Sequence, residues 1–181
     1  KRKVDTRKDD FNEIYDEFIN QKAQEQSSRC SQCGVPFCQV HCPLSNNIPD
    51  WLKLTAEGRL KEAYELSQNT NNMPEVCGRI CPQDRLCEGN CVIEKSGHGT
   101  VTIGSMEKYI TDNAWEQGWI KPIKVKYERD QSIGVIGAGP AGLAAAEQLR
   151  KNGYNITVYD RYDRAGGLLI YGIPNFKLEK Y

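Results

Sequence analysis

All eight cysteines of this 181-residue chain lie between residues 30 and 91, in two groups of four. The first group is Cys30, Cys33, Cys38 and Cys42, and the second is Cys77, Cys81, Cys87 and Cys91. Thiolates gathered at this density are typical of metal centres, because deprotonated sulfur is a soft and strong ligand. The cysteine frame therefore constrains the fold of the first part of the chain more than its hydrophobic pattern does.

Four interpretations of the two groups compete: iron–sulfur clusters, zinc, disulfide bonds and unlinked buried thiols. Unlinked thiols behave as small core hydrophobes and would not gather beside arginine, glutamine and proline. Disulfide bonds need an oxidising compartment, and the charged N-terminal residues carry no apolar run of a secretory signal. Iron and zinc are therefore the two favoured interpretations.

The spacing within each group separates iron from zinc. Zinc sites usually combine two compact pairs of Cys or His across a longer spacer. Here the intervals are two, four and three residues in the first group, and three, five and three in the second. Bacterial ferredoxins use C-x2-C-x2-C-x3-C-P, which the first group matches through Cys42-Pro43 except for a longer middle gap. The spacing favours iron–sulfur clusters, with zinc as the alternative.

The chain has two histidines, His41 and His98. Because so many thiols are close by, we expect neither histidine to bind metal. His41 lies between two candidate ligands, so we expect it to shape the hydrogen bonding around a cluster.

The charge balance excludes several classes of partner. Lys plus Arg and Asp plus Glu number 24 each, so a formal net charge of zero gives no field that would attract nucleic acid or an acidic membrane. No apolar run is long enough to cross a bilayer. We expect a soluble, cytoplasmic protein with no nucleic-acid and no membrane partner, in a compartment that keeps thiols reduced.

Helical periodicity dominates the region around the cysteines. It predicts a helix over residues 8–28, two short helices between residues 47 and 67, and an amphipathic helix over 104–117. The hairpin of the two short helices would bring the two cysteine groups together.

Composition changes after this region. We expect a helical domain over residues 1–118 and a charged, proline-containing linker over 119–131. Residues 132–181 then form the start of a second domain.

The second domain opens with a short buried-strand pattern that runs into Gly137-Ala-Gly-Pro-Ala-Gly142. A strong helix former and a second strand pattern ending at Asp160 follow. Gly137 would permit the tight turn, Gly139 the approach of a pyrophosphate, and Gly142 close helix–strand packing. The helix N-terminus attracts phosphates and Asp160 a ribose hydroxyl, so the order predicts a dinucleotide-binding unit.

The identity of the dinucleotide is less constrained. Arg161, directly after the acid, could accommodate a 2′-phosphate, which keeps NADP open. The second glycine doublet, Gly166-Gly167, would let backbone pass close to an extended ligand and favours FAD.

These motifs together resemble a known family. The runs Cys-Ser-Gln-Cys-Gly-Val-Pro-Phe-Cys, Cys-Gly-Arg-Ile-Cys-Pro-Gln-Asp-Arg-Leu-Cys and Gly-Val-Ile-Gly-Ala-Gly-Pro-Ala-Gly are similar to the small (β) subunit of NADPH-dependent glutamate synthase. The N-terminal module of dihydropyrimidine dehydrogenase is a more distant relative. The resemblance covers nearly the whole chain from residue 8. It implies an α-helical domain with two [4Fe-4S] clusters, followed by the start of an α/β Rossmann-type FAD-binding domain.

The resemblance also implies the ligands. One cluster would be held by Cys30, Cys33, Cys38 and Cys91. The other would be held by Cys42, Cys81, Cys87 and a fourth ligand, for which the thiolate of Cys77 is preferred over Glu107. The FAD positions would be Gly137, Ala138, Gly139, Pro140, Ala141, Gly142, Asp160, Gly166, Gly167, Leu168 and Lys177. No residue is expected to be catalytic, since the cofactors carry the redox chemistry.

The implied function is electron transfer. Electrons from NADPH would pass through FAD and the clusters to an FMN-containing large subunit that makes glutamate from 2-oxoglutarate and glutamine. The family continues with an NADPH-binding domain and the rest of the FAD domain, so we expect a fragment of such an enzyme. Alternatives are a ferredoxin- or pyrimidine-reducing flavoprotein module, a zinc-stapled interaction module, and a non-enzymatic docking piece.

Overall fold

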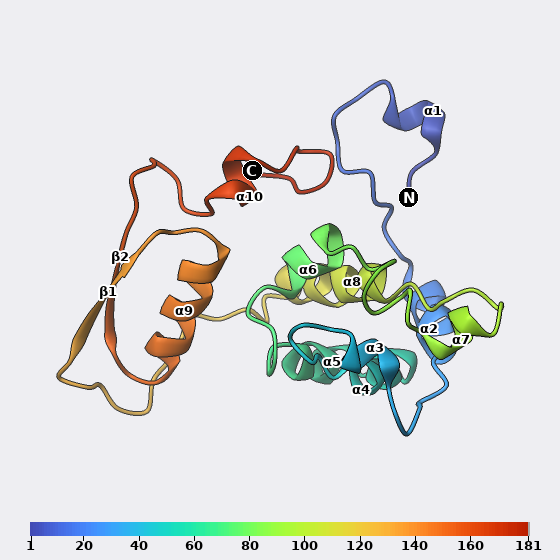
Figure 1. Cartoon of the computed structure of the whole chain (residues 1–181), viewed down its shortest axis with the longest axis horizontal. Coiled ribbons are helices and arrows are strands. Elements are labelled where there is room, and N and C mark those ends of the chain that lie inside the picture. Colours follow the sequence, from blue (N-terminus) through green and yellow to red (C-terminus); the bar gives the residue numbers. More distant parts are fainter. Residues whose placement is uncertain (181) are drawn as a thin grey trace. The chain divides into compact units, whose positions relative to one another are not determined.

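The computed structural model describes residues 1–180 and divides the chain into two compact units (Figure 1). The first unit contains residues 1–2 and 15–120, and the second contains residues 3–14 and the chain from Lys121 onward. The second unit thus includes residues 3–14, which we expected in the helical domain. The domain bounds themselves stay a prediction.

The first unit is built from short helices. They are α2 (Asn20–Ser28), α3 (Phe37–Val40), α4 (Ile48–Ala56), α5 (Leu60–Ser67), α6 (Pro74–Ile80), α7 (Val92–Lys95) and α8 (Ile103–Glu116). The predicted pair of short helices is confirmed as α4 and α5, and the predicted amphipathic helix as α8. Gly58, at φ +74°, makes the turn between α4 and α5. Within residues 1–180, no helix has the length and apolar character that crossing a membrane requires.

The prediction of one continuous helix over residues 8–28 is wrong, since α2 begins only at Asn20. The preceding segment uses its polar groups for contacts distant in sequence. The backbone N–H of Ile14 donates to the carbonyl of Phe176 at 2.9 Å, and the Tyr15 hydroxyl donates to the carbonyl of Arg79 at 2.7 Å. Ile14 and Tyr15 also belong to different units. Apolar periodicity alone does not reveal such tertiary contacts.

The core of the first unit is formed mainly by α4 and α8. Trp51 and Leu52 of α4 and Met106 and Ile110 of α8 are each at most 1% exposed. Burying one such side chain contributes about 1.5–3 kcal/mol. Four cysteines pack against this core: Cys30, Cys38, Cys42 and Cys87. The hydrophobic core and the cysteine frame are therefore one folding unit.

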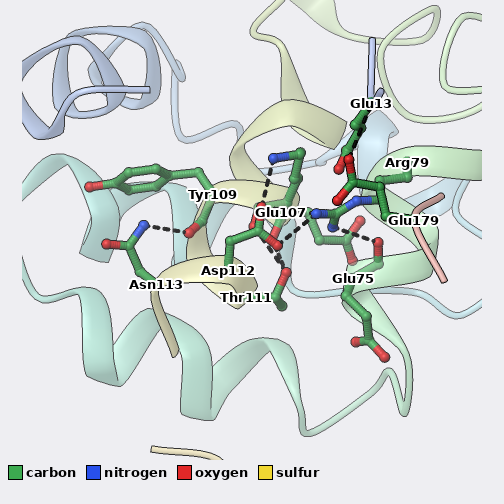
Figure 2. A network of polar contacts seen from close by, with 10 residues as sticks. Glu13, Glu75, Arg79, Glu107, Tyr109, Thr111, Asp112, Asn113 and Glu179 are labelled. Atoms are coloured by element: carbon green, nitrogen blue, oxygen red, sulfur yellow. Dashed lines mark hydrogen bonds and ion pairs between the residues drawn. The ribbon is translucent and has the colours of Figure 1, made fainter. Parts of the chain in front are cut away.

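Helices α6 and α8 cross at very close range. A Cβ on Gly78 of α6 would lie 2.7 Å from the backbone nitrogen of Lys108 and 2.8 Å from the carbonyl oxygen of Gly104. Beside this crossing, Arg79 Nη2 contacts Asp112 Oδ1 at 2.9 Å, and Lys108 Nζ contacts Asp112 Oδ2 at 2.6 Å (Figure 2). A glycine and a partly buried ion network thus hold the helix that carries Cys77 against α8.

The Gly78→Ala substitution should lower the free energy of unfolding of the first unit by about 1–3 kcal/mol, because the added methyl group meets backbone rather than a flexible side chain. Thermal denaturation followed by circular dichroism would measure the loss. Gly34→Ala is the matched control, since a Cβ at Gly34 has no neighbour within 4 Å. Equal melting temperatures of the two variants would contradict the close crossing.

The second unit contains α1 (Val4–Arg7), β1 (Ser132–Ile136), α9 (Pro140–Lys151), β2 (Asn155–Tyr159) and α10 (Leu168–Tyr171). The strands β1 and β2 are parallel, with Ser132 opposite Asn155 and Ile136 opposite Tyr159. Helix α9 packs against both strands. The predicted strand–helix–strand order is confirmed.

Burial of the two strands differs from the expectation. Val135 is partly buried next to the position of Gly142 in α9. Ile136 is 93% exposed and Tyr159 is 60% exposed. Neighbouring residues of a strand point to opposite faces, and in both strands exposed and partly buried residues alternate. The expected buried strand is therefore buried on one face only.

Candidate metal centres and dinucleotide site

Four cysteines from distant parts of the sequence line one cavity in the first unit. They are Cys30, Cys33, Cys38 and Cys91. Phe37, Leu52 and Ile103 are among the apolar side chains that complete its wall. Cys91 belongs to the second group in the sequence, yet here it joins three members of the first. This is the set that the family resemblance implied for one cluster.

Gln32 shapes the loop between Cys30 and Cys33. Its backbone is left-handed, at φ +49°, which is unusual for a residue with a side chain. The Gln32 amide nitrogen donates to the carbonyl of Pro49 at 2.7 Å and contacts the Cys30 sulfur at 3.4 Å. Gln32 thus anchors the loop on α4 and supplies a hydrogen bond to a candidate ligand. Sequence reasoning missed this residue, because nothing in its spacing distinguishes it.

Arg29 connects the segment after Cys91 to Cys30. Its guanidinium donates to the carbonyl oxygens of His98, Gly99 and Thr100 at 3.0, 2.6 and 3.1 Å. These carbonyls follow α7, which begins directly after Cys91. The contact helps to explain how Cys91 reaches the first cysteine group.

Two thiols of this cavity, Cys30 and Cys38, have a raised pKa in the absence of a cation. Burial raises the pKa of Cys38 to about 12, together with the neighbouring Cys30, Cys91 and Cys33 and against the effect of one backbone hydrogen bond. Burial likewise raises the pKa of Cys30. Several thiolates packed this closely repel one another, and bound metal offsets that repulsion as it displaces the protons. The donor set and its apolar wall therefore fit an iron–sulfur group.

The remaining cysteines form a second set. A hydrogen bond from Cys77 lowers the pKa of Cys81, against the raising effects of burial and of the neighbouring Glu107, Cys87 and Cys42. The same hydrogen bond is the main reason why the pKa of Cys77 is raised. Burial raises the pKa of Cys87 to about 12. The two sequence groups are therefore interleaved in space.

Glu107 of α8 lies beside this second set and is 6% exposed. Its Oε1 accepts hydrogen bonds from Asn71 Nδ2 at 3.1 Å and from Asn46 Nδ2 at 3.4 Å. Burial raises the pKa of Glu107 well above its usual value, and Cys77 adds to this effect. Cys77 and Glu107 both border the second set, so the choice of Cys77 as the fourth ligand stays a prediction.

Two further polar residues hold the second cysteine loop in place. Glu88 Oε1 accepts a hydrogen bond from the backbone N–H of Gly104 at 2.9 Å, in the first turn of α8. Gln83 Nε2 donates to the carbonyls of Cys77 and Gly78 at 3.1 and 3.2 Å. Burial raises the pKa of Glu88. Sequence reasoning missed both residues, because their partners are backbone groups on other helices.

His41 is the exposed C-cap residue of α3, with Nδ1 2.9 Å from the carbonyl oxygen of Phe37. The cysteines do not form a site for a single metal ion. Across residues 1–180, no three His, Cys, Asp or Glu side chains converge on the position of one ion. The four thiolates of a [4Fe-4S] cluster bind different irons, so they surround a volume rather than one point.

The glycine loop of the second unit has the geometry expected of a dinucleotide site. Gly137 adopts φ +100°, and a Cβ on Gly142 would lie 1.8 Å from the Gly137 carbonyl oxygen. A Cβ on Gly139 would have no neighbour within 4 Å. Gly139 is the N-cap residue of α9 and makes no side-chain cap, so the first N–H groups of α9 are left for a ligand. Pro140 and Ala141 form its first turn.

Asp160 is bound to this loop. Its carboxylate accepts hydrogen bonds from the backbone N–H groups of Ala138 and Tyr162. Both lower the pKa of Asp160, Ala138 the more strongly. A backbone hydrogen bond from Arg161 also lowers the pKa of Asp160. A carboxylate has about four lone-pair positions, so about one remains for a ribose hydroxyl.

The second glycine doublet meets the first glycine loop. The Gly166 N–H donates to the carbonyl of Ala138 at 2.7 Å, and a Cβ on Gly167 would lie 2.9 Å from the Cα of Gly139. Leu168, in contrast, is 73% exposed. Lys177 is exposed and its backbone N–H bonds locally to Pro174. The glycines of the predicted FAD site therefore come together, whereas the side chains of Leu168 and Lys177 are exposed.

Arg161 is exposed and lies against the side chain of Tyr162. Its guanidinium carbon lies 4.7 Å from the centre of the Tyr162 ring, and Nη2 contacts the Tyr162 hydroxyl at 2.6 Å. Tyr162 in turn stacks on Tyr171, with ring centres 4.7 Å apart.

Comparison with protein families matches both units. Residues 7–119 match the family described as dihydropyrimidine dehydrogenase domain II, 4Fe-4S cluster. Residues 135–171 match an NAD(P)-binding Rossmann-like domain. The chain is thus an iron–sulfur domain followed by the start of a Rossmann-like domain. It belongs to the dihydropyrimidine dehydrogenase domain II family of 4Fe-4S cluster domains.

Individual relatives confirm the predicted resemblance. The chain is 73% identical to the glutamate synthase [NADPH] small chain of Azospirillum brasilense over 99% of this chain and 37% of that protein. It is 51% identical to the protein of the same name in Escherichia coli K12, over 99% of this chain and 38% of that one. It is also 49% identical to the putative oxidoreductase AegA of E. coli K12, over 98% and 27%. The chain therefore spans less than two-fifths of the length of these relatives.

Proposed function

We propose that the chain is the electron-transfer part of an oxidoreductase related to the glutamate synthase small chains, and that its first unit holds two [4Fe-4S] clusters. The observation that carries the proposal is the shared cavity of Cys30, Cys33, Cys38 and Cys91. A ligand set that crosses between two cysteine groups is typical of two-cluster ferredoxins. Cys42, Cys77, Cys81 and Cys87 then remain for the second cluster.

Bound clusters would supply one-electron transfer, and bound FAD would link it to the two-electron chemistry of NADPH. The residues of this chain hold and tune these groups. Gln32 donates to the Cys30 sulfur, and hydrogen bonds to a ligating sulfur affect cluster potential. Glu88 fixes the loop of the second group at the start of α8.

We further propose that the second unit binds the pyrophosphate of FAD at residues 137–142, with Asp160 on the ribose. The uncapped start of α9 and the space at Gly139 support this assignment. Gly166 and Gly167 lie against the same loop and would border the ligand. Leu168 and Lys177 stay in the proposal on the family resemblance alone.

By analogy with the small chains of glutamate synthase, the electron acceptor would be an FMN-containing large subunit that forms glutamate from 2-oxoglutarate and glutamine. A second candidate is an oxidoreductase with another acceptor, such as ferredoxin or a pyrimidine. The 49% identity to the putative oxidoreductase AegA supports this second candidate, because AegA is not named as a glutamate synthase. In both cases the residues of this chain have the same roles.

Anaerobic redox titration tests electron transfer. The purified chain should be brown, and dithionite should bleach its visible absorption. Mixing the reduced chain with the large subunit of a glutamate synthase should restore the absorption faster than buffer does. A colourless chain with stoichiometric zinc would contradict the proposal and favour a zinc-stapled module. Reoxidation by ferredoxin but not by the large subunit would favour the second candidate.

A further inference from the structure

Residues 82–89, here called the Cys87 loop, contain Cys87 and form a loop that is closed on itself. The Gly89 N–H donates to the carbonyl of Gln83 at 3.0 Å. A Cβ on Gly89 would clash with the carbonyl oxygen of Asp84, so only glycine permits this closure. Because the loop is closed at its base, a contact made by a side chain near either end also helps to place Cys87.

Two side chains attach the Cys87 loop to two different helices. Near the start of the loop, Gln83 Nε2 donates to the carbonyls of Cys77 and Gly78, in the last turn of α6, at 3.1 and 3.2 Å. Near its end, Glu88 Oε1 accepts a hydrogen bond from the backbone N–H of Gly104, in the first turn of α8, at 2.9 Å. The loop therefore satisfies backbone groups at the C-terminal end of one helix and at the N-terminal end of another.

Helix α8 has no side-chain cap of its own. Its N-cap residue is Thr102, a residue type that commonly caps helices, yet Thr102 makes no cap hydrogen bond. In the part of the chain that the structure describes, the buried Thr102 hydroxyl has no hydrogen-bond partner. Glu88, 16 positions away in the sequence, supplies the acceptor instead. Burial raises the pKa of Glu88, and backbone hydrogen bonds from Gly104 and Ile103 oppose that effect. The cap of α8 thus comes from a residue directly beside a candidate metal ligand.

Helix α8 is the fixed element of this pair, since its Met106 and Ile110 lie in the core and are each 0% exposed. We propose that Glu88 is a positioning residue for the second metal centre, whose hydrogen bond to the start of α8 holds the adjacent Cys87 sulfur where a cluster needs it. A cluster binds well only where its ligands are held around one volume. The inference rests on the proposed function, because it takes a cluster at the second cysteine set, but it does not depend on which residue is the fourth ligand.

Three variants of the 181-residue chain separate the placing of Cys87 from the capping of α8. Glu88→Ala removes the acceptor, and Glu88→Gln keeps an acceptor oxygen of the same reach. Glu88→Ala combined with Thr102→Asp gives α8 a carboxylate at its own N-cap but leaves the Cys87 loop unattached to α8. Asp84→Ala is the matched control, since Asp84 is an exposed acid of the same loop. Iron and sulfide per chain, the integrated EPR signal of the reduced protein and hydrogen exchange of α8 are measured after anaerobic purification.

Glu88→Ala should lose about half of the iron, which corresponds to one of two clusters, and the first turns of α8 should exchange faster. The double variant should regain the protection of α8 but not the iron. Glu88→Gln and Asp84→Ala should keep nearly all of the iron. The half that remains in Glu88→Ala also reports that the first unit has folded.

Full retention of iron in Glu88→Ala would overturn the inference. Recovery of iron together with the protection of α8 in the double variant would also overturn it, because Glu88 would then act only as a helix cap. If Glu88→Ala does not fold, the double variant decides in the same way, and loss of half of the iron from a folded Glu88→Gln would count against the role of the acceptor oxygen. Absence of iron from the unsubstituted chain would instead contradict the proposed function.

Discussion

Cys91→Ser should remove about half of the iron from the anaerobically purified chain and leave the second cluster in place. The physical reason is that Cys91 lines the cavity of Cys30, Cys33 and Cys38, although in sequence it belongs to the second group. Serine is close in size to cysteine but lacks the soft sulfur ligand. Iron analysis combined with EPR of the reduced protein measures the loss.

Double variants identify which cluster Cys91 serves. Cys33→Ser combined with Cys91→Ser should lose no more iron than either single change, because both act on one centre. Cys81→Ser combined with Cys91→Ser should lose nearly all of the iron. Residues that act as a unit give such non-additive effects, whereas independent sites add. The opposite pattern of the two double variants would contradict the interleaved arrangement.

Gly142→Ala should unfold the second unit or destabilise it by about 3 kcal/mol or more. The new Cβ would lie 1.8 Å from the carbonyl oxygen of Gly137. Because this oxygen belongs to the backbone, the clash can be relieved only if α9 moves away from β1. Hydrogen exchange of α9 and β1 should accelerate sharply, whereas exchange in α4 and α8 of the first unit should change little. Unchanged protection of α9 would contradict the close packing.

Gly139→Ala is the control for this experiment and separates binding from folding. Its backbone, at φ −76° and ψ 179°, is accessible to alanine, and the added Cβ meets no atom within 4 Å. Stability should therefore change by less than about 0.5 kcal/mol. Affinity for FAD, measured by quenching of flavin fluorescence, should fall about tenfold or more, since the methyl group occupies the proposed path of the pyrophosphate. Equal affinities would argue against phosphate binding there.

The sequence predicts the elements of this chain better than it predicts their contacts. The glycine pattern around α9 predicts the strand–helix–strand unit correctly. A turn with φ above zero and a close helix–strand approach can be made by few residue types other than glycine. Helices α4, α5 and α8 likewise follow from periodicity. The prediction of a helix over residues 8–28 fails, because Ile14 and Tyr15 donate hydrogen bonds to residues far along the chain.

The candidate site shows the same limit. Cysteine spacing indicates the type of metal group, but it does not reveal that Cys91 faces the first group; that grouping came from the family resemblance. Gln32, Arg29 and Glu88 could not be found from spacing, because they bind backbone carbonyls and N–H groups of other segments. The hydrogen bonds that Asn46 and Asn71 donate to Glu107 could not be predicted for a similar reason, since the three residues lie far apart in the sequence.

The most direct test of the central claim is the content of iron, acid-labile sulfide and zinc per chain after anaerobic purification. Two [4Fe-4S] clusters on the eight cysteines predict about eight iron atoms and about eight sulfides per chain, with little zinc. About four of each would leave one of the two cysteine sets without a cluster. One or two zinc ions per chain with no sulfide would contradict the iron–sulfur assignment altogether.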